Sequence, residues 1–124
     1  MRKIGWFDIY VDDMERAQAF YETVLDTTLE PMDDPNDPSA RMRAFGDDFV
    51  SHGAGGALVK LAHAQPGPGG SMVYFSCDDC AVEQARVVGA GGTVVRPKSS
   101  IGDHGFVAIA TDTEGNMIGL HSQA

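Results

Sequence analysis

The stretch Lys3–Leu25, KIGWFDIYVDDMERAQAFYETVL, decides the fold of this chain. Its odd-numbered positions from 7 to 11 are apolar and alternate with more polar neighbours, as one face of a β-strand requires. Either Asp12 or Asp13 can then cap a helix by accepting hydrogen bonds from its first N–H groups, and Glu15 would complete a capping box with Asp12. The predicted apolar stripe of the helix consists of Met14, Ala17, Phe20, Tyr21, Val24 and Leu25. The stretch therefore predicts a strand, an acidic corner and a helix that covers the strand.

The same pattern recurs 66 residues later, in Ser71–Gly91, SMVYFSCDDCAVEQARVVGAG. Asp13 then aligns with Asp79, and the same shift aligns Thr27 with Thr93. A constant offset through a strand, a helix and the next strand indicates an internal duplication. Two copies predict a pseudo-symmetric pair of modules rather than a solenoid.

Both halves of the chain predict the order β-α-β-β-β, which makes the fold class α+β. Strands are expected at 4–11, 27–32, 40–45, 57–62, 72–77, 93–97, 105–111 and 116–121, with the second helix at about 80–89. The segment 64–70 is rich in Pro and Gly and is predicted to be a linker. We therefore expect one domain, 1–124, made of two modules at about 1–63 and 71–124.

Composition limits the classes of function. Hydrophobic residues make up 43% of the chain and charged residues 22%, which is ordinary for a globular protein. No apolar run reaches the ~18 residues that a membrane helix needs, and the start reads as a strand rather than a signal peptide, so a cytoplasmic location without membrane contact is expected. The net charge of −9, without any basic cluster, argues against nucleic-acid binding and favours a neutral or cationic ligand.

Several motifs occur in the order that one known family shows. They are the residues 12–14, 16–17 and 20–21, the Gly-rich turn 89–92, and the sequence DTEGN at 112–116. Together they resemble the glyoxalase / bleomycin-resistance / extradiol-dioxygenase (vicinal oxygen chelate) superfamily over nearly the whole chain. The resemblance implies two modules that curl an open, mixed sheet or barrel around a pocket, often completed in a homodimer. It says little about the reaction, because one scaffold can carry many chemistries.

The resemblance also locates the family's metal ligands. Metal-using members bind a divalent ion through His and Glu side chains from four strands, and here these positions carry Trp6, Lys60, Met72 and Gly119. Gly has no side chain, Trp offers no lone pair, and protonated Lys is only a donor. Because such a metal needs imidazole or carboxylate ligands, the resemblance implies that the usual metal site is absent, and no cofactor is expected.

Strand alternation predicts what lines the pocket instead. Side chains on the strand faces opposite the helices should point into one cavity, where aromatic rings and a few polar groups could hold a small molecule. The predicted ligand-binding residues are Trp6, Asp8, Tyr10, Lys60, Met72, Tyr74 and His121. As alternatives, Asp8 and Lys60 form an ion pair in a filled interior, and His121 is a solvated side chain near the C-terminus.

Two weaker signals point to other chemistry. Cys77 and Cys80 have C-x-x-C spacing, but no second Cys pair would complete a structural zinc site, and two reduced thiols are expected. His52, His63 and His104 share no motif spacing. They are expected to be structural or exposed, and a displaced metal site built from them is the alternative.

Three functions remain open from the sequence. The first is a metal-free small-molecule-binding or sequestering protein, similar to the drug-binding resistance members of the superfamily. The second is a metal-dependent lyase or dioxygenase with a rearranged His/Asp site. The third is a metal-free enzyme, of lyase, isomerase or dioxygenase type, in which Asp8, Tyr10 or His121 performs acid–base chemistry.

Overall fold

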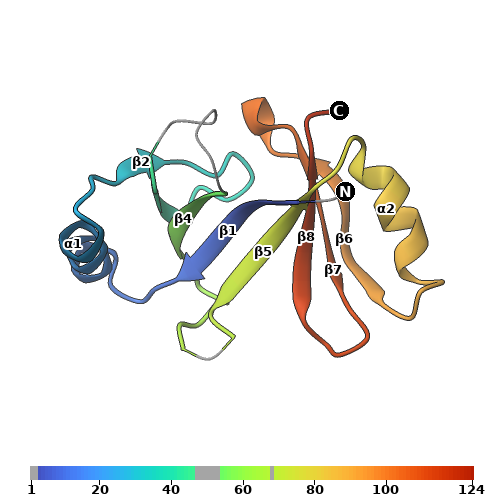
Figure 1. Ribbon diagram of the computed structural model, residues 1–124, viewed down its shortest axis with the longest axis horizontal. Coiled ribbons are helices and arrows are strands. Elements are labelled where there is room, and N and C mark those ends of the chain that lie inside the picture. Colours follow the sequence, from blue (N-terminus) through green and yellow to red (C-terminus); the bar gives the residue numbers. More distant parts are fainter. Residues whose placement is uncertain (1–2, 47–53, 68) are drawn as a thin grey trace. The chain divides into compact units, whose positions relative to one another are not determined.

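A computed structural model describes residues 3–46, 54–67 and 69–124 of the chain (Figure 1). Within these residues each half follows the order β-α-β-β-β, so the α+β class is confirmed. The first half contains β1 (Ile4–Tyr10), α1 (Met14–Leu25), β2 (Glu30–Met32), β3 (Arg41–Ala44) and β4 (Gly55–Lys60). The second contains β5 (Ser71–Ser76), α2 (Cys80–Val87), β6 (Thr93–Ser100), the 3-10 turn η1 (Gly102–His104), β7 (Phe106–Thr111) and β8 (Met117–Ser122).

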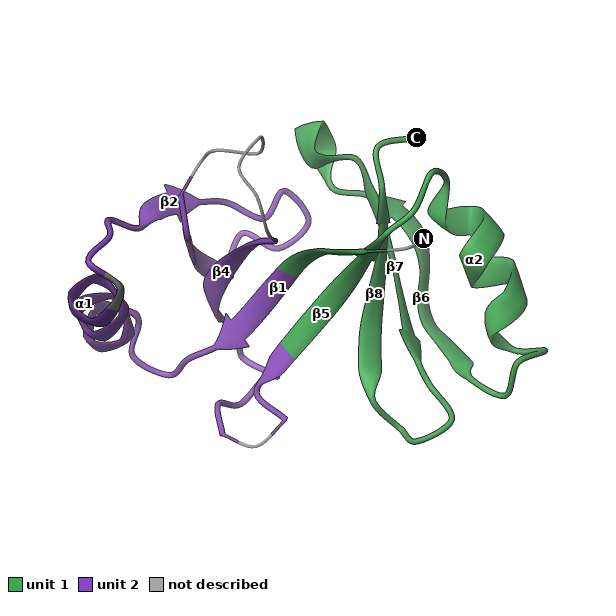
Figure 2. Cartoon of the chain, viewed as in Figure 1, with its two compact units in different colours: residues 1–6, 72–124 green, residues 7–71 purple. Residues whose placement is uncertain are grey.

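The chain divides into two compact units, which Figure 2 shows in different colours. The first-half unit consists of residues 7–71, and the second-half unit consists of residues 1–6 and 72–124. The beginning of β1 therefore belongs to the second-half unit, where the carbonyl of Lys3 accepts a hydrogen bond from the Ser76 N–H at 2.8 Å. Each unit is described by itself below.

In the first-half unit, α1 begins where Asp13 caps it. The Asp13 carboxylate accepts a hydrogen bond from the Arg16 N–H at 3.0 Å, so Asp13 rather than Asp12 is the cap. Glu15 consequently forms no capping box and binds Arg41 of β3 instead. The helix ends at Asp26, whose φ of 49° is left-handed, as is common at helix C-termini.

The interior of this unit lies between α1 and one face of its strands. Val11, Met14, Leu29 and Leu58 form the buried cluster, with partly buried residues packed against it. The prediction for the helix stripe is wrong at two positions, because Phe20 and Val24 are 51% and 63% exposed. Met14 belongs to the cluster, and Ala17 and Tyr21 pack against it. The side chain of Leu25, the remaining predicted member, lies outside the described part of the structure.

In the second-half unit the strands lie in the spatial order β5, β8, β7 and β6, and α2 packs on β8, β7 and β6 (Figure 1). Cys80, Ala108 and Leu120 form the buried cluster beneath the helix. Asp79 caps α2 by accepting from the Ala81 N–H at 2.9 Å, and the Cys80 N–H donates to the Ser122 hydroxyl at 3.0 Å. The first turn of α2 is therefore tied to β8.

The start of one strand differs from the prediction because the end of a helix extends further. β2 begins at Glu30 rather than at residue 27, because the Thr27 and Leu29 N–H groups both donate to Glu22 and so complete the end of α1. Residues 112–116 form the turn between the antiparallel strands β7 and β8, where the Asp112 carboxylate accepts from the Glu114 and Asn116 N–H groups.

No helix in the described part of the chain is long and apolar enough to cross a membrane. The cytoplasmic location stays a prediction.

Candidate functional site

The face of β1 opposite α1 carries Asp8 and Tyr10. Asp8 is only 7% exposed, and Tyr10 is half-buried. Burial, and to a lesser degree the charge of Asp8, raises the pKa of Tyr10 to about 12. The phenol therefore stays protonated at neutral pH and can donate a hydrogen bond to a ligand beside a buried carboxylate.

Lys60 does not share this face, so its predicted place is wrong. Lys60 is opposite Arg41 in the antiparallel pair of β3 and β4, and Arg41 binds Glu15 of α1. Leu58, two residues earlier on the same strand, lies in the cluster beneath α1. Because strand residues two apart share a face, Lys60 belongs to the face that α1 covers.

In the second-half unit, Met72 and Tyr74 lie on the face of β5 opposite α2. Phe75, on the other face, packs against the cluster beneath α2. Tyr74 is opposite Gly119 of β8, and a Cβ atom at Gly119 would overlap the Tyr74 ring. Gly119 therefore leaves room for this ring to lie flat on the neighbouring strand, and Met72 beside it is only 4% exposed.

His121 lies on the same face of β8 and is held by a backbone group. Its Nε2 atom is 2.6 Å from the carbonyl oxygen of His104 in η1, and a carbonyl can only accept. Nε2 is therefore the protonated nitrogen, and Nδ1 of the neutral ring keeps a lone pair. His121 is half-buried in β8 and is not the solvated terminal side chain of the alternative interpretation.

The predicted residues are divided between the two units. Trp6, Met72, Tyr74 and His121 belong to the second-half unit, and Asp8, Tyr10 and Lys60 to the first-half unit. That the remaining six line one cavity stays a prediction.

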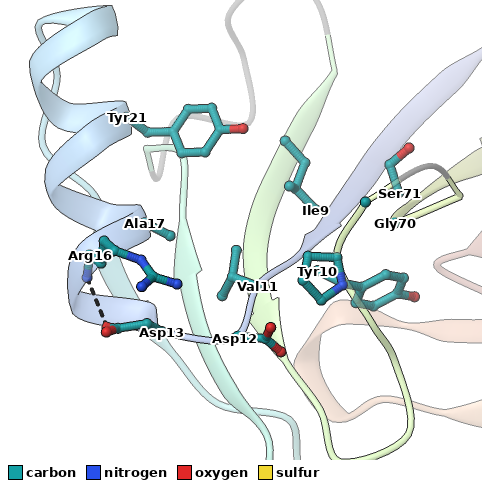
Figure 3. A pocket seen from close by; sticks show the side chains of 12 residues that line it. Ile9, Tyr10, Val11, Asp12, Asp13, Arg16, Ala17, Tyr21, Gly70 and Ser71 are labelled. Carbon is teal, nitrogen blue, oxygen red and sulfur yellow. Dashed lines mark hydrogen bonds between the residues drawn. The ribbon is translucent and has the colours of Figure 1, made fainter.

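A cavity of about 460 Å³ lies within the first-half unit, between the end of β1, the first turns of α1 and the segment before β5 (Figure 3). Its lining residues are Ile9, Tyr10, Val11, Asp12, Asp13, Arg16, Ala17, Tyr21, Pro66, Gly67, Gly70 and Ser71. The Tyr10 N–H donates to the Gly70 carbonyl at 2.9 Å and so fixes one wall against β1.

The polar groups of this cavity were not predicted, apart from Tyr10. Figure 3 shows the Arg16 guanidinium and the Tyr21 hydroxyl directed from α1 toward β1, with the Asp12 carboxylate at the corner. One sequence signal could have indicated two of them: Arg16 and Asp12 are four residues apart around the cap of α1. The wall formed by Pro66, Gly67, Gly70 and Ser71 carries no such signal, because it reaches β1 only through the fold.

Metal ligands do not gather in the described residues. No three His, Cys, Asp or Glu side chains in residues 3–46, 54–67 and 69–124 are grouped so that they could hold a metal ion. His52 lies outside the described residues. Cys77 and Cys80 are both reduced, and Cys80 is fully buried.

Residues 3–120 match the family described as the Glyoxalase/Bleomycin resistance protein/Dioxygenase superfamily. Two curated proteins, from Mycobacterium bovis and Mycobacterium tuberculosis and both named "Putative glyoxylase CFP32", are 31% identical over 116 residues. The match covers 93% of this chain but only 42% of those proteins, so the chain spans about two fifths of their length.

Solved structures share the fold at low identity. A hypothetical protein from Bacillus halodurans, BH1468, has a TM-score of 0.74 at 12% identity, covering 99% of this chain and 95% of that one. Methylmalonyl-CoA epimerase from Mycobacterium tuberculosis has a TM-score of 0.72 at 16% identity, covering 98% and 87%. An epimerase variant from Streptomyces coelicolor, in complex with 2-nitronate-propionyl-CoA, has a TM-score of 0.70 at 16% identity, covering 98% and 94%.

Proposed function

The chain belongs to the Glyoxalase/Bleomycin resistance protein/Dioxygenase superfamily, and from this premise we propose that it binds a small molecule without the superfamily's usual divalent metal. One observation carries the proposal. A position that corresponds to a family metal ligand is Gly119, and the ring of Tyr74 occupies the space that a side chain there would need. The ring of Tyr74 thus lies where the side chain of a metal-binding residue would otherwise be.

The nature of the ligand follows from the side chains on the strand faces opposite the helices. Tyr10 and Tyr74 offer ring surface, and the buried Asp8 favours a neutral or cationic partner over an anion. Because the phenol of Tyr10 stays protonated at neutral pH, it can donate to a carbonyl or hydroxyl oxygen of the ligand. The chemistry of these groups favours a neutral or cationic aromatic molecule.

A thermal-shift screen tests the proposal with zinc, nickel and manganese and with a panel of neutral and cationic aromatic compounds. An aromatic compound should raise the melting temperature without added metal. Tyr10→Ala and Tyr74→Ala should each reduce that rise, whereas Phe20→Ala, which removes an exposed ring of α1, should leave it unchanged. Stabilisation by metal alone, abolished by replacing two histidines, would overturn the proposal.

A second candidate is a metal-free enzyme. The name glyoxylase of the 31%-identical relatives favours catalysis, and the ring nitrogen Nδ1 of His121 can accept a proton because Nε2 is held as a donor. Solvent-deuterium incorporation into methylmalonyl-CoA, chosen from the epimerase structures, is the assay. Exchange that is lost in His121→Gln would support this candidate over simple binding.

We further propose that the two βαβββ modules act as one domain and that two chains form a homodimer. Phe20 and Val24, one turn apart on α1, supply exposed apolar surface for a second copy. Sedimentation should give twice the 13.2 kDa of one chain. Phe20→Ser should shift the protein toward the monomer without lowering its melting temperature in dilute solution.

A further inference from the structure

The cavity beside α1 is a second candidate binding site. It lies on the side of β1 that faces the helix, whereas Asp8 lies on the other side. Its floor is apolar, since Ile9 and Val11 face the helix and Ala17 lines the wall opposite them. A volume of about 460 Å³ falls within the range of small-molecule sites. The surface is thus concave, and apolar side chains and polar groups contribute comparable parts of it.

Those polar groups carry opposite charges that the described chain does not neutralise. Neither the Arg16 guanidinium nor the Asp12 carboxylate forms a hydrogen bond or ion pair with any residue that the structure describes. The neighbouring Asp13 is already engaged as the cap of α1. One exposed cation and one exposed anion, Arg16 and Asp12, are therefore available to a ligand at the edge of the cavity.

The hydroxyl of Tyr21 adds a neutral group to the set. Its ring is fixed by edge contacts with Phe20 and Phe45, with centroids 5.1 and 5.6 Å apart. The hydroxyl is directed toward β1 (Figure 3) and has no hydrogen-bond partner among the described residues. A rigid ring presents it to the cavity at little entropic cost.

We propose that this cavity binds a free α-amino acid with an apolar side chain. A guanidinium holds a carboxylate with two parallel hydrogen bonds, and a carboxylate holds an ammonium group. Arg16 takes the α-carboxylate, Asp12 takes the α-ammonium group, and the side chain covers Ile9, Val11 and Ala17. A simple anion would be repelled by the Asp12 carboxylate, and a simple cation by the Arg16 guanidinium. A zwitterion can pair with both residues.

This site shares Tyr10 with the proposed strand-face site, but its own binding groups are Arg16 and Asp12, so variants of these two residues distinguish its failure from a failure of the proposed function. Titrations use the full chain and four probes, monitored by NMR chemical shifts. L-Leucine carries all three features, glycine lacks the apolar side chain, N-acetyl-L-leucine lacks the ammonium group, and L-leucinamide lacks the carboxylate. L-Leucine should bind at least about tenfold more tightly than each of the others, the loss expected for one charge-assisted hydrogen bond or one apolar side chain. The shifts should be concentrated at Ile9, Ala17 and Tyr21.

Two variants separate the charges. Arg16→Gln should weaken L-leucine binding about tenfold and leave L-leucinamide unaffected, and Asp12→Asn should weaken L-leucine but not N-acetyl-L-leucine. Arg96→Gln and Asp33→Asn, at exposed positions elsewhere, are the matched controls and should bind L-leucine as the parent does. Equal affinity for the four probes, shifts outside the cavity, or equal losses in the control variants would overturn the proposal.

Discussion

The two strand–corner–helix regions of the chain use the same cap and surround it differently. Asp13 caps α1 and has Arg16 close by, whereas Asp79 caps α2 and binds the Lys98 ammonium group at 2.8 Å. The residue aligned with Arg16 is Val82, which is 47% exposed. The same local signal thus starts both helices, while the neighbours decide whether charged groups remain available at the corner.

The first residue of each helix also differs in size. Met14 is 1% exposed in the cluster beneath α1, and Cys80 is fully buried beneath α2. The helices themselves differ in length, with 12 and 8 residues. A long side chain is thus buried at the start of the longer helix, and a small one at the start of the shorter helix.

The largest expected effect on stability comes from truncating the buried side chains of Met14 and Cys80 to alanine. Met14→Ala should lower the free energy of unfolding by about 3 kcal/mol, because truncation of a buried Met loses both transfer energy and packing. Cys80→Ala removes a single atom and should cost about 1 kcal/mol. Urea unfolding with an unchanged m-value measures both. Equal losses would contradict the difference between the two buried side chains.

A smaller effect is expected from filling the space under Tyr74. Gly119→Ala should destabilise the chain by about 2 kcal/mol, because the added methyl group forces the ring off β8. Gly89→Ala is the matched control, since the position beyond α2 has room for a Cβ atom and should be nearly neutral. In the double variant with Tyr74→Ala, the penalty of Gly119→Ala should shrink. Additive losses would show that the ring is not the obstacle.

The caps themselves should matter less. Asp13→Ala should cost about 1 kcal/mol, the usual value of an N-cap. Asp79→Ala should lower stability more than Asp13→Ala, because it also releases Lys98, whose ammonium group lies 4.7 Å from the centre of the Phe106 ring. Asp12→Ala, beside the cap but without its hydrogen bond, serves as the control for both. If chemical denaturation gave a larger loss of unfolding free energy for Asp13→Ala than for Asp79→Ala, the comparison would be contradicted.

The smallest effect is a difference in acid stability. The hydrogen bond from Lys98, followed by that from the Ala81 N–H, holds the pKa of Asp79 below its ordinary value. A lowered pKa in the folded state gives stability that is complete above the unfolded value near 4 and is lost as the pH falls through the folded pKa. Lys98→Met should therefore flatten the fall in unfolding free energy below about pH 4. Parallel curves for parent and variant would argue against the ion pair.

Local patterns predicted the elements well because strands and helices have short periods. The offset of 66 residues located both caps, and the alternation around Asp8 and Tyr10 placed them opposite α1. The prediction for Lys60 was wrong because alternation shows which residues of a strand share a face, but not which of the two faces points toward the helix. This choice of face is the phase of the strand. That phase depends on Leu58 packing against Met14, a contact between residues far apart in the sequence.

The sequence alone determined the superfamily and the order of the elements, since each depends on residue identity and spacing. The tertiary structure decided which aspartate caps α1 and that the ring of Tyr74 rests on Gly119. It also decided that Arg16, Asp12, Gly67 and Gly70 line one cavity. The physical reason is the distance along the chain over which each kind of interaction acts. Periodicity and capping act over a few residues, whereas register, burial and cavities arise from packing between segments that only the folded chain brings together.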